Sequence, residues 1–185
     1  MILPVNKRND TLHQKNTMIE TARLILLPLN YEQLLKYARN DGSLEAALGL
    51  HNNSRVISEE LKEALDNTII PNVAVAGRNF LFNTIWTAIS KEDQIMVGDL
   101  CIIGEPDEEG GIEIGYGTYE GLQGKGYMTE IVNGIISWAG SVPGVRLIRA
   151  SCHASNIGSV KVLSRNNFEQ VSETKEQINW KLILP

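Results

Sequence analysis

Three consecutive segments of alternating apolar and polar residues constrain the fold of this chain most strongly. They cover residues 80–90, 95–104 and 111–120, and the polar turns KEDQ and EPDEEGG join them. A period of two residues is typical of β-strands that have one buried face. Because the connections are short and polar, we expect three neighbouring antiparallel strands.

The N-terminal third combines one extended segment with helical patterns. Residues 19–29 are rich in branched apolar side chains and predict a single strand. Asn30 is placed to cap a first helix, and residues 43–50 predict a second, short one. A third helix is expected to begin at Ser58 and to lose its pattern before Pro71.

The C-terminal third alternates helices and strands. After a glycine-rich stretch, one helix is predicted to present an apolar face of Ile131, Val132, Ile135, Ile136 and Ala139. A strand over 145–154, a capped helix within 155–168 and a final strand over 178–184 follow, and an asparagine in RNNF is expected to take the left-handed position at the end of that helix. The order β, α-rich, βββ, α, β, α, β predicts a mixed α/β sheet covered by helices.

Length and charge limit the possible classes of protein. The chain has 185 residues and a formal net charge of -5. We expect one domain over residues 18–185, preceded by a loosely ordered extension over 1–17 that has no signal-peptide core or membrane span. The negative charge argues against nucleic acid as the main partner. No membrane association is expected.

The cysteines predict free thiols. Cys101 and Cys152 are far apart and form no CxxC pair, which makes a disulfide framework or a zinc site unexpected and suits a cytoplasmic protein. No metal-ligand motif such as HExxH occurs. His153 follows Cys152, but adjacent residues on a strand face opposite ways, so we expect a polar strand end and not a nucleophilic pair.

The glycine-rich stretch GLQGKGYMTE, Gly121 to Glu130, lies between a predicted strand and a predicted helix. Helix N-termini leave backbone N–H groups without intrahelical partners, and the helix dipole is positive there, so phosphate oxygens bind well. The stretch matches neither the P-loop nor the Rossmann pattern. By itself it is equally compatible with an ordinary strand-to-helix turn.

Three blocks of the sequence resemble the GNAT superfamily of acyl-CoA-dependent N-acyltransferases. ETARLILLPL, IEIGYGTYEGLQGKGYMTE and ASNIGSVKVLSRNNF occur in the family's order and look like the branch of ribosomal-protein N-terminal alanine acetyltransferases. The family's pyrophosphate loop falls on Gln123, Gly126 and Met128, and the methionine departs from the usual glycine or alanine. The resemblance implies a central, mostly antiparallel, splayed sheet with helices on both faces.

The resemblance also implies a binding mode for acetyl-CoA. The pantetheine arm would pair with the strand at Tyr116, Gly117 and Thr118, and Asn156 would contact it from the later helix. The remaining residues that it assigns to the cofactor, through the pyrophosphate loop, are Gln123, Gly124, Lys125, Gly126, Tyr127, Met128 and Thr129. Lys161 and Arg165 are candidates for the 3′-phosphate, or belong to a solvated helix face.

The expected chemistry is transfer of an acetyl group from a thioester to an amine. Glu113 is our candidate base, with a solvated strand glutamate as the alternative. Many family members protonate the leaving thiolate with a tyrosine seven residues after the asparagine, but this chain has Leu163 there. The catalytic candidates are therefore Glu113, Asn156, which is equally a candidate helix cap, and Ser159, with water as the alternative proton donor.

Two functions remain open at this point. The first is an N-acetyltransferase that acts on a protein N-terminus or a small-molecule amine. The second is a non-catalytic CoA-binding sensor or interaction protein, which the small pair Gly117–Thr118 favours because related chains carry bulkier residues there. The sequence does not identify the acceptor, which we expect to contact residues 40–75 and the loop before the final strand. A monomer and a homodimer are both compatible with an open sheet.

Overall fold

The computed structural model describes residues 17–53, 55–75 and 77–185. The extension predicted for residues 1–17 falls, except for Thr17, outside these ranges. The described chain contains an eight-stranded sheet with the order β1-β2-β3-β4-β5-β6-β8-β7. Every neighbouring pair is antiparallel except β5 and β6, which are parallel. This confirms the predicted mixed, mostly antiparallel sheet.

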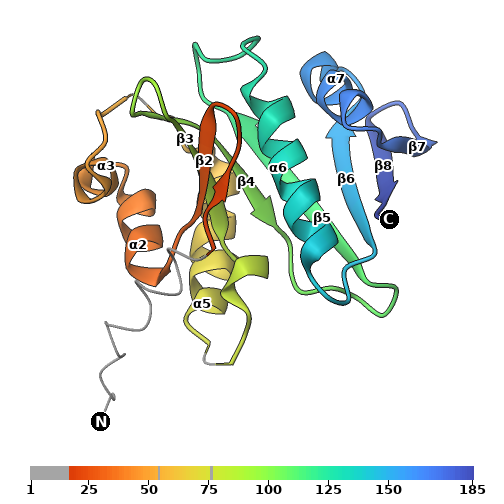
Figure 1. Ribbon diagram of the computed structural model, residues 1–185, viewed down its shortest axis with the longest axis horizontal. Helices are drawn as coiled ribbons and strands as arrows, with labels where there is room; N and C mark the ends of the chain where they lie inside the picture. The colour runs from red at the N-terminus through yellow and green to blue at the C-terminus, as the bar shows by residue number, and fades with distance from the viewer. Residues whose placement is uncertain (1–16, 54, 76) are drawn as a thin grey trace.

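The strands are β1 (Ile19–Glu20), β2 (Leu24–Pro28), β3 (Ile85–Ser90), β4 (Met96–Ile102), β5 (Gly111–Thr118), β6 (Leu147–His153), β7 (Glu169–Glu173) and β8 (Gln177–Ile183). The helices are α2 (Tyr31–Arg39), α3 (Ser43–Leu48), α4 (Glu59–Ala64), α5 (Ile70–Val73), α6 (Tyr127–Ser141) and α7 (Ile157–Arg165). A π-helical segment, η1 (Leu65–Ile69), joins α4 to α5, and a 3-10 turn, η2 (Phe80–Phe82), precedes β3. Figure 1 shows the order of these elements along the chain.

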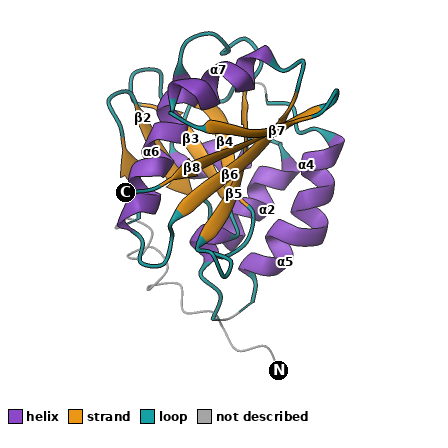
Figure 2. Cartoon of the chain, turned by 90° about the vertical axis from the view of Figure 1, so that its right-hand side faces the viewer, coloured by secondary structure: helices purple, strands orange, loops and turns teal. Residues whose placement is uncertain are grey.

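Helices cover both faces of the sheet. Figure 2 shows α6 on one side and α2, α4 and α5 on the other. Beneath α6 and α7 lies a large apolar cluster that includes Trp86, Ile112 and Ile135, and beneath the N-terminal helices lies a second one around Leu34 and Leu65. The apolar face predicted for the helix after the glycine-rich stretch is confirmed, because its inward residues are buried against the sheet.

The predicted helix ends are formed by the expected residues. Asn30 caps α2 through a capping box with Gln33, and Ser58 accepts a hydrogen bond from the Leu61 N–H at the start of α4. Asn167, just after α7, has a φ angle of 61°, as expected for the asparagine in RNNF. These ends depend on short-range chemistry and could therefore be predicted from sequence.

The prediction of one strand over residues 19–29 is wrong. The segment forms a hairpin in which β1 and β2 pair, and the chain turns at Thr21. The Thr21 N–H donates to the Leu24 carbonyl, and the Thr21 hydroxyl accepts from the Leu24 N–H. A threonine side chain that bonds to nearby backbone favours a turn over an extended strand.

Two further expectations also need correction. The third helix does not end before Pro71. It continues through the π-helical η1, which ends at Ile69, and through α5 to Val73. A π-turn is one of the irregularities that lets a helix accommodate a proline. The expected order of elements lacked β7, whose residues are all exposed and show no alternation of burial.

The sheet splays between β5 and β6. The two strands pair only through Gly111–Ile114 and Leu147–Ala150. Beyond this point β6 continues its pairing with β8 alone, up to His153. One edge of β5 therefore diverges from β6 at Gly115, and the remaining residues of β5, to Thr118, lead toward the glycine-rich loop.

Candidate functional site

A cleft of about 300 Å³ lies where β5 and β6 diverge. Three elements line it: the end of β5, the glycine-rich loop with the first turn of α6, and α7. The residues concerned are Tyr116, Gly117, Thr118, Leu122, Gln123, Gly124, Gly126, Tyr127, Met128, Thr129, Asn156, Gly158, Ser159, Lys161, Val162 and Arg165. Most of the residues expected to contact a cofactor thus surround a single cavity.

The glycine-rich loop bends in a way that glycine favours. Gly121, Gly124 and Gly126 have φ angles of 75°, 77° and 78°, in the left-handed region where a side chain is unfavourable. Gly126 is the N-cap of α6 and provides no side-chain cap. The first-turn N–H groups of α6 are therefore available to an anion in the cleft.

Tyr116 and Asn156 both form hydrogen bonds with the backbone of Ser159, in the first turn of α7. The Tyr116 hydroxyl donates to the Ser159 carbonyl over 3.4 Å, and Asn156 Oδ1 accepts from the Ser159 N–H over 3.0 Å. Burial raises the pKa of Tyr116 to about 12. This phenol is therefore a neutral hydrogen-bond donor at physiological pH, and the capping role expected for Asn156 is confirmed.

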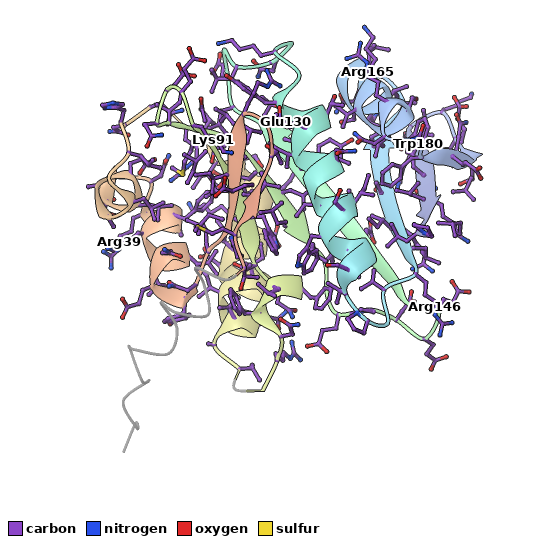
Figure 3. All side chains as sticks on the ribbon, in the orientation of Figure 1. Arg39, Lys91, Glu130, Arg146, Arg165 and Trp180 are labelled. Atoms are coloured by element: carbon purple, nitrogen blue, oxygen red, sulfur yellow. The ribbon has the colours of Figure 1, made fainter. Side chains whose placement is uncertain are left out.

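Two of the three lysine and arginine residues predicted to contact the cofactor line the cleft, and the third does not. Lys161 and Arg165 line the cleft from α7, and Figure 3 labels Arg165 on that helix. Lys125 does not line the cleft, and its backbone carbonyl accepts a hydrogen bond from Arg23. Leu163, at the position where many family members carry a tyrosine, is fully buried in the core.

Glu113 lies on the opposite face of β5 from α6. Ile112 and Ile114 are buried beneath the helices, so the intervening carboxylate is exposed on the other side and does not line the cleft. In the parallel pairing of β5 with β6, Glu113 lies opposite Arg149. The ion pairs of Arg149 are with Asp107 and Glu109. A base at Glu113 would have to act from the face that α6 and α7 leave uncovered.

A buried polar network lies on that same face, beneath α2. The hydroxyls of Tyr37 and Tyr119 both donate to Asp99 Oδ2 over 2.6 Å. The Arg55 guanidinium lies 4.1 Å from the centre of the Tyr37 ring and forms an ion pair with Glu45. Burial raises the pKa of Asp99, although hydrogen bonds from both tyrosines oppose the shift. Asp99 lies directly opposite Gly117 of the cleft.

Two groups of residues near the site were not predicted from the sequence. Asp99 interrupts an otherwise apolar strand, and a carboxylate at an inward position was a signal that could have been noticed. Arg23 and Glu130 form an ion pair between residues far apart in the sequence, and their spacing offered no signal.

The two cysteines and His153 lie as the sequence predicted. Cys101 and Cys152 are free thiols, as predicted. His153 is the exposed last residue of β6, and its Nδ1 lies 2.7 Å from the Ser155 hydroxyl.

Among the described residues, no helix is long and apolar enough to span a bilayer, and no group of three or more potential metal ligands comes together.

The fold and the cleft define an acetyltransferase. Residues 23–169 match the acetyltransferase (GNAT) domain family, and the chain belongs to it. The predicted class of enzyme, an acetyl-CoA-dependent N-acetyltransferase, is thereby confirmed, as is the GNAT fold.

Individual relatives agree with this assignment. The chain is 30% identical over 166 residues to the uncharacterized N-acetyltransferase YjdG of Bacillus subtilis, covering 88% of this chain and 96% of YjdG. The ribosomal-protein-S5-alanine acetyltransferase of Vibrio fischeri has a similar fold, with a TM-score of 0.66, 17% identity, and coverage of 90% and 96%. The ribosomal L7/L12 α-N-protein acetyltransferase RimL, in complex with coenzyme A, has a TM-score of 0.62, 18% identity, and coverage of 90% and 98%.

Proposed function

We propose that the domain over residues 18–185 transfers the acetyl group of acetyl-CoA to a primary amine, either a protein N-terminus or a small molecule. The observation that carries the proposal is the divergence of β5 from β6 at Gly115, next to the start of α6. An extended pantetheine arm adds to such an open strand edge as another strand would. The pyrophosphate then meets the helix N-terminus.

The cleft residues divide between the parts of the cofactor. The backbone of Tyr116, Gly117 and Thr118 faces the pantetheine, and the N–H groups of the loop from Gly124 to Thr129 hold the pyrophosphate. Lys161 and Arg165 provide positive charge for the 3′-phosphate, because both side chains line the cleft.

The transfer proceeds by direct attack on the thioester. The neutral amine nitrogen bonds to the acetyl carbon, and a backbone N–H near Gly117 stabilises the resulting oxyanion. The carbon–sulfur bond then breaks, and Glu113 receives the proton that the amine loses, directly or through water. The thiolate leaves as the thiol after it takes a proton from Tyr116 or Ser159, which line the same cleft.

The acceptor is proposed by class only. Several proteins of the same fold are named as acetyltransferases of ribosomal-protein N-termini, which makes peptides with a free α-amine the first candidates. We expect the acceptor to approach from the face of β5 on which Glu113 and Gly117 are exposed. We propose a cytoplasmic protein, monomeric or homodimeric.

The alternative function is a CoA-binding sensor without efficient turnover. It is favoured by the exposed position of Glu113 outside the cleft. Calorimetric titration with acetyl-CoA, followed by measurement of CoA release with a panel of N-terminal peptides and small amines, separates the two. Binding with turnover supports the enzyme. Binding without turnover on a broad panel supports the sensor, and absence of binding contradicts both.

A further inference from the structure

The N-terminal hairpin is fastened to the first turn of α6 by one carboxylate. Glu130 Oε1 accepts from the Thr21 hydroxyl over 2.6 Å and from the Arg23 N–H over 2.7 Å, and Oε2 accepts from Arg23 Nε over 2.7 Å. Burial by itself would raise the pKa of Glu130, but these hydrogen bonds outweigh it and lower the pKa. The carboxylate is therefore charged and fully engaged near neutral pH.

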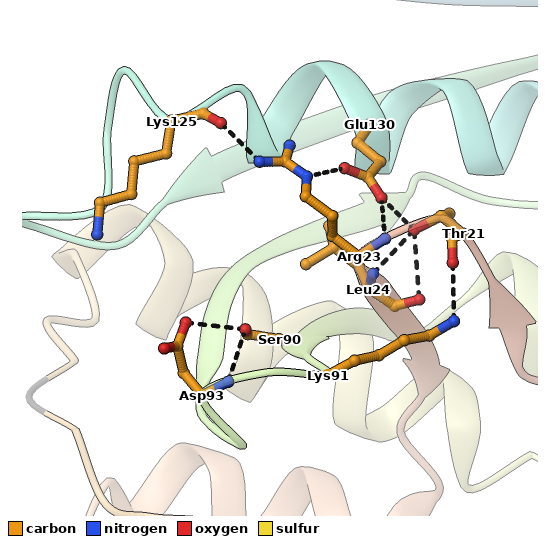
Figure 4. A network of polar contacts seen from close by, with 8 residues as sticks. All are labelled: Thr21, Arg23, Leu24, Ser90, Lys91, Asp93, Lys125 and Glu130. Carbon is orange, nitrogen blue, oxygen red and sulfur yellow. Dashed lines mark hydrogen bonds and ion pairs between the residues drawn. The ribbon is translucent and has the colours of Figure 1, made fainter.

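Arg23 extends from this ion pair to the glycine-rich loop. Its Nη1 donates to the Lys125 carbonyl over 3.0 Å, and its guanidinium lies 4.9 Å from the centre of the Tyr127 ring. Figure 4 shows Arg23 between Glu130 and the Lys125 carbonyl. Arg23 itself does not line the cleft, so it supports the loop from behind.

The contact between Arg23 and the Lys125 carbonyl also fixes the direction of the next backbone N–H, that of Gly126. The bond between Lys125 and Gly126 is trans, and in a planar trans peptide the carbonyl and the N–H point in opposite directions. A carbonyl held toward Arg23 therefore directs the Gly126 N–H away from Arg23. Gly126 lines the cleft. Because glycine is conformationally permissive, its own backbone preference fixes this orientation only weakly, and the contact from Arg23 restricts it.

We propose that Arg23, fixed by Glu130, is a positioning residue that orients the loop amides for the pyrophosphate of acetyl-CoA. This inference rests on the proposed function, because it assigns a role within the same cleft. Arg23 contributes its planar fork of donors: one side bonds the Glu130 carboxylate and the other bonds a backbone carbonyl. A lysine would keep the charge but could not maintain both contacts in this geometry.

The test compares two thioesters. Acetyl-CoA carries the pyrophosphate, and S-acetylpantetheine does not. For Arg23→Ala, Arg23→Lys and Glu130→Gln we expect KM for acetyl-CoA to rise about tenfold with kcat nearly unchanged, while kcat/KM for S-acetylpantetheine stays within about twofold of wild type. Calorimetric affinities for CoA and pantetheine should follow the same pattern and require no acceptor.

Lys91→Ala is the matched control. Lys91 also fastens the hairpin, through the Glu20 carboxylate and the Thr21 carbonyl, but it does not reach the loop. We expect this variant to bind CoA as the wild type does. Thermal unfolding of each variant checks that it is folded.

Four results would overturn the proposal. Equal losses with both thioesters would mean that Arg23 acts on the whole fold or on the chemistry. Normal CoA affinity in Arg23→Lys would reduce its role to charge, and normal affinity in Arg23→Ala would remove the role altogether. A wild-type protein that binds no CoA would contradict the proposed function itself, and the inference with it, before any variant is compared.

Discussion

Asp99 on β4 lies directly opposite Gly117 on β5, so a buried carboxylate adjoins the strand segment that borders the cleft between β5 and α7. Gly117 has no side chain, and a Cβ atom at this position would meet no other atom within 4 Å. The two residues therefore join this cleft to the polar network beneath α2. Conditions that change the charge of Asp99 should also affect the stability of this region.

The first prediction concerns pH and stability. Because burial raises the pKa of Asp99 above the usual 3.8, the folded state holds this proton more tightly than the unfolded state does. The Asp99 contribution to the free energy of unfolding should therefore decline as pH rises from 3.8 to the raised value. Asp99→Asn, which retains an oxygen for the tyrosines, should remove this decline.

Urea unfolding between about pH 4 and pH 8 measures the effect. Asp66→Asn, which changes an exposed carboxyl on η1, is the control and should preserve the wild-type profile. Identical profiles for Asp99→Asn and the wild type would show that Asp99 does not hold its proton more tightly in the folded state.

The second prediction tests Glu113 as the base. Glu113→Gln should lower kcat roughly 100-fold, because the glutamine cannot accept the amine proton. The calorimetric affinity for acetyl-CoA should stay within about twofold, since Glu113 lies outside the cleft. Glu108→Gln, in the exposed turn before β5, is the control. Unchanged turnover would remove Glu113 from the mechanism.

The third prediction identifies the proton donor for the thiolate. With a pKa of about 12, Tyr116 remains protonated in the cleft, and phenylalanine would retain the ring while removing the proton. We expect Tyr116→Phe to lower kcat about tenfold or more, with little change in KM for acetyl-CoA. If Ser159→Ala causes the larger loss instead, the serine hydroxyl and not the phenol is the donor.

The fourth prediction separates backbone strain from cofactor binding. Gly124 and Gly104 have φ angles of 77° and 83°, and a Cβ atom at either would meet no neighbour within 4 Å. Alanine at either position should therefore cost about 1–2 kcal/mol of stability. Only Gly124 lines the cleft, so only Gly124→Ala should also weaken acetyl-CoA binding. Equal affinities in the two variants would argue against phosphate binding by this loop.

Local chemistry made much of the fold predictable. The cap at Asn30, the cap at Ser58, the left-handed Asn167 and the period-two strands all depend on residues a few positions apart. The glycine-rich stretch likewise marked the loop before α6, because glycine is needed where φ is positive. The residues proposed to bind the cofactor could be named as a group because most of them lie in that loop and the adjoining strand.

Contacts between distant residues decided the rest. The turn at Thr21 is held partly by Glu130, more than 100 positions away, through a 2.6 Å hydrogen bond, so no local pattern could reveal the β1–β2 hairpin. The wholly exposed β7 is a strand only because β8 pairs with it. The face occupied by Glu113 relative to the cleft likewise became clear only from the assembled sheet.

The sequence by itself thus determined where helices begin, which segments alternate, and that a glycine-rich loop precedes α6. Only the tertiary structure decided where β5 leaves β6, that Arg23 supports the loop from behind, and that Asp99 is buried opposite Gly117. The physical reason is range: caps and strand periodicity arise from neighbouring residues, whereas sheet register and buried ion pairs form only when distant segments pack together.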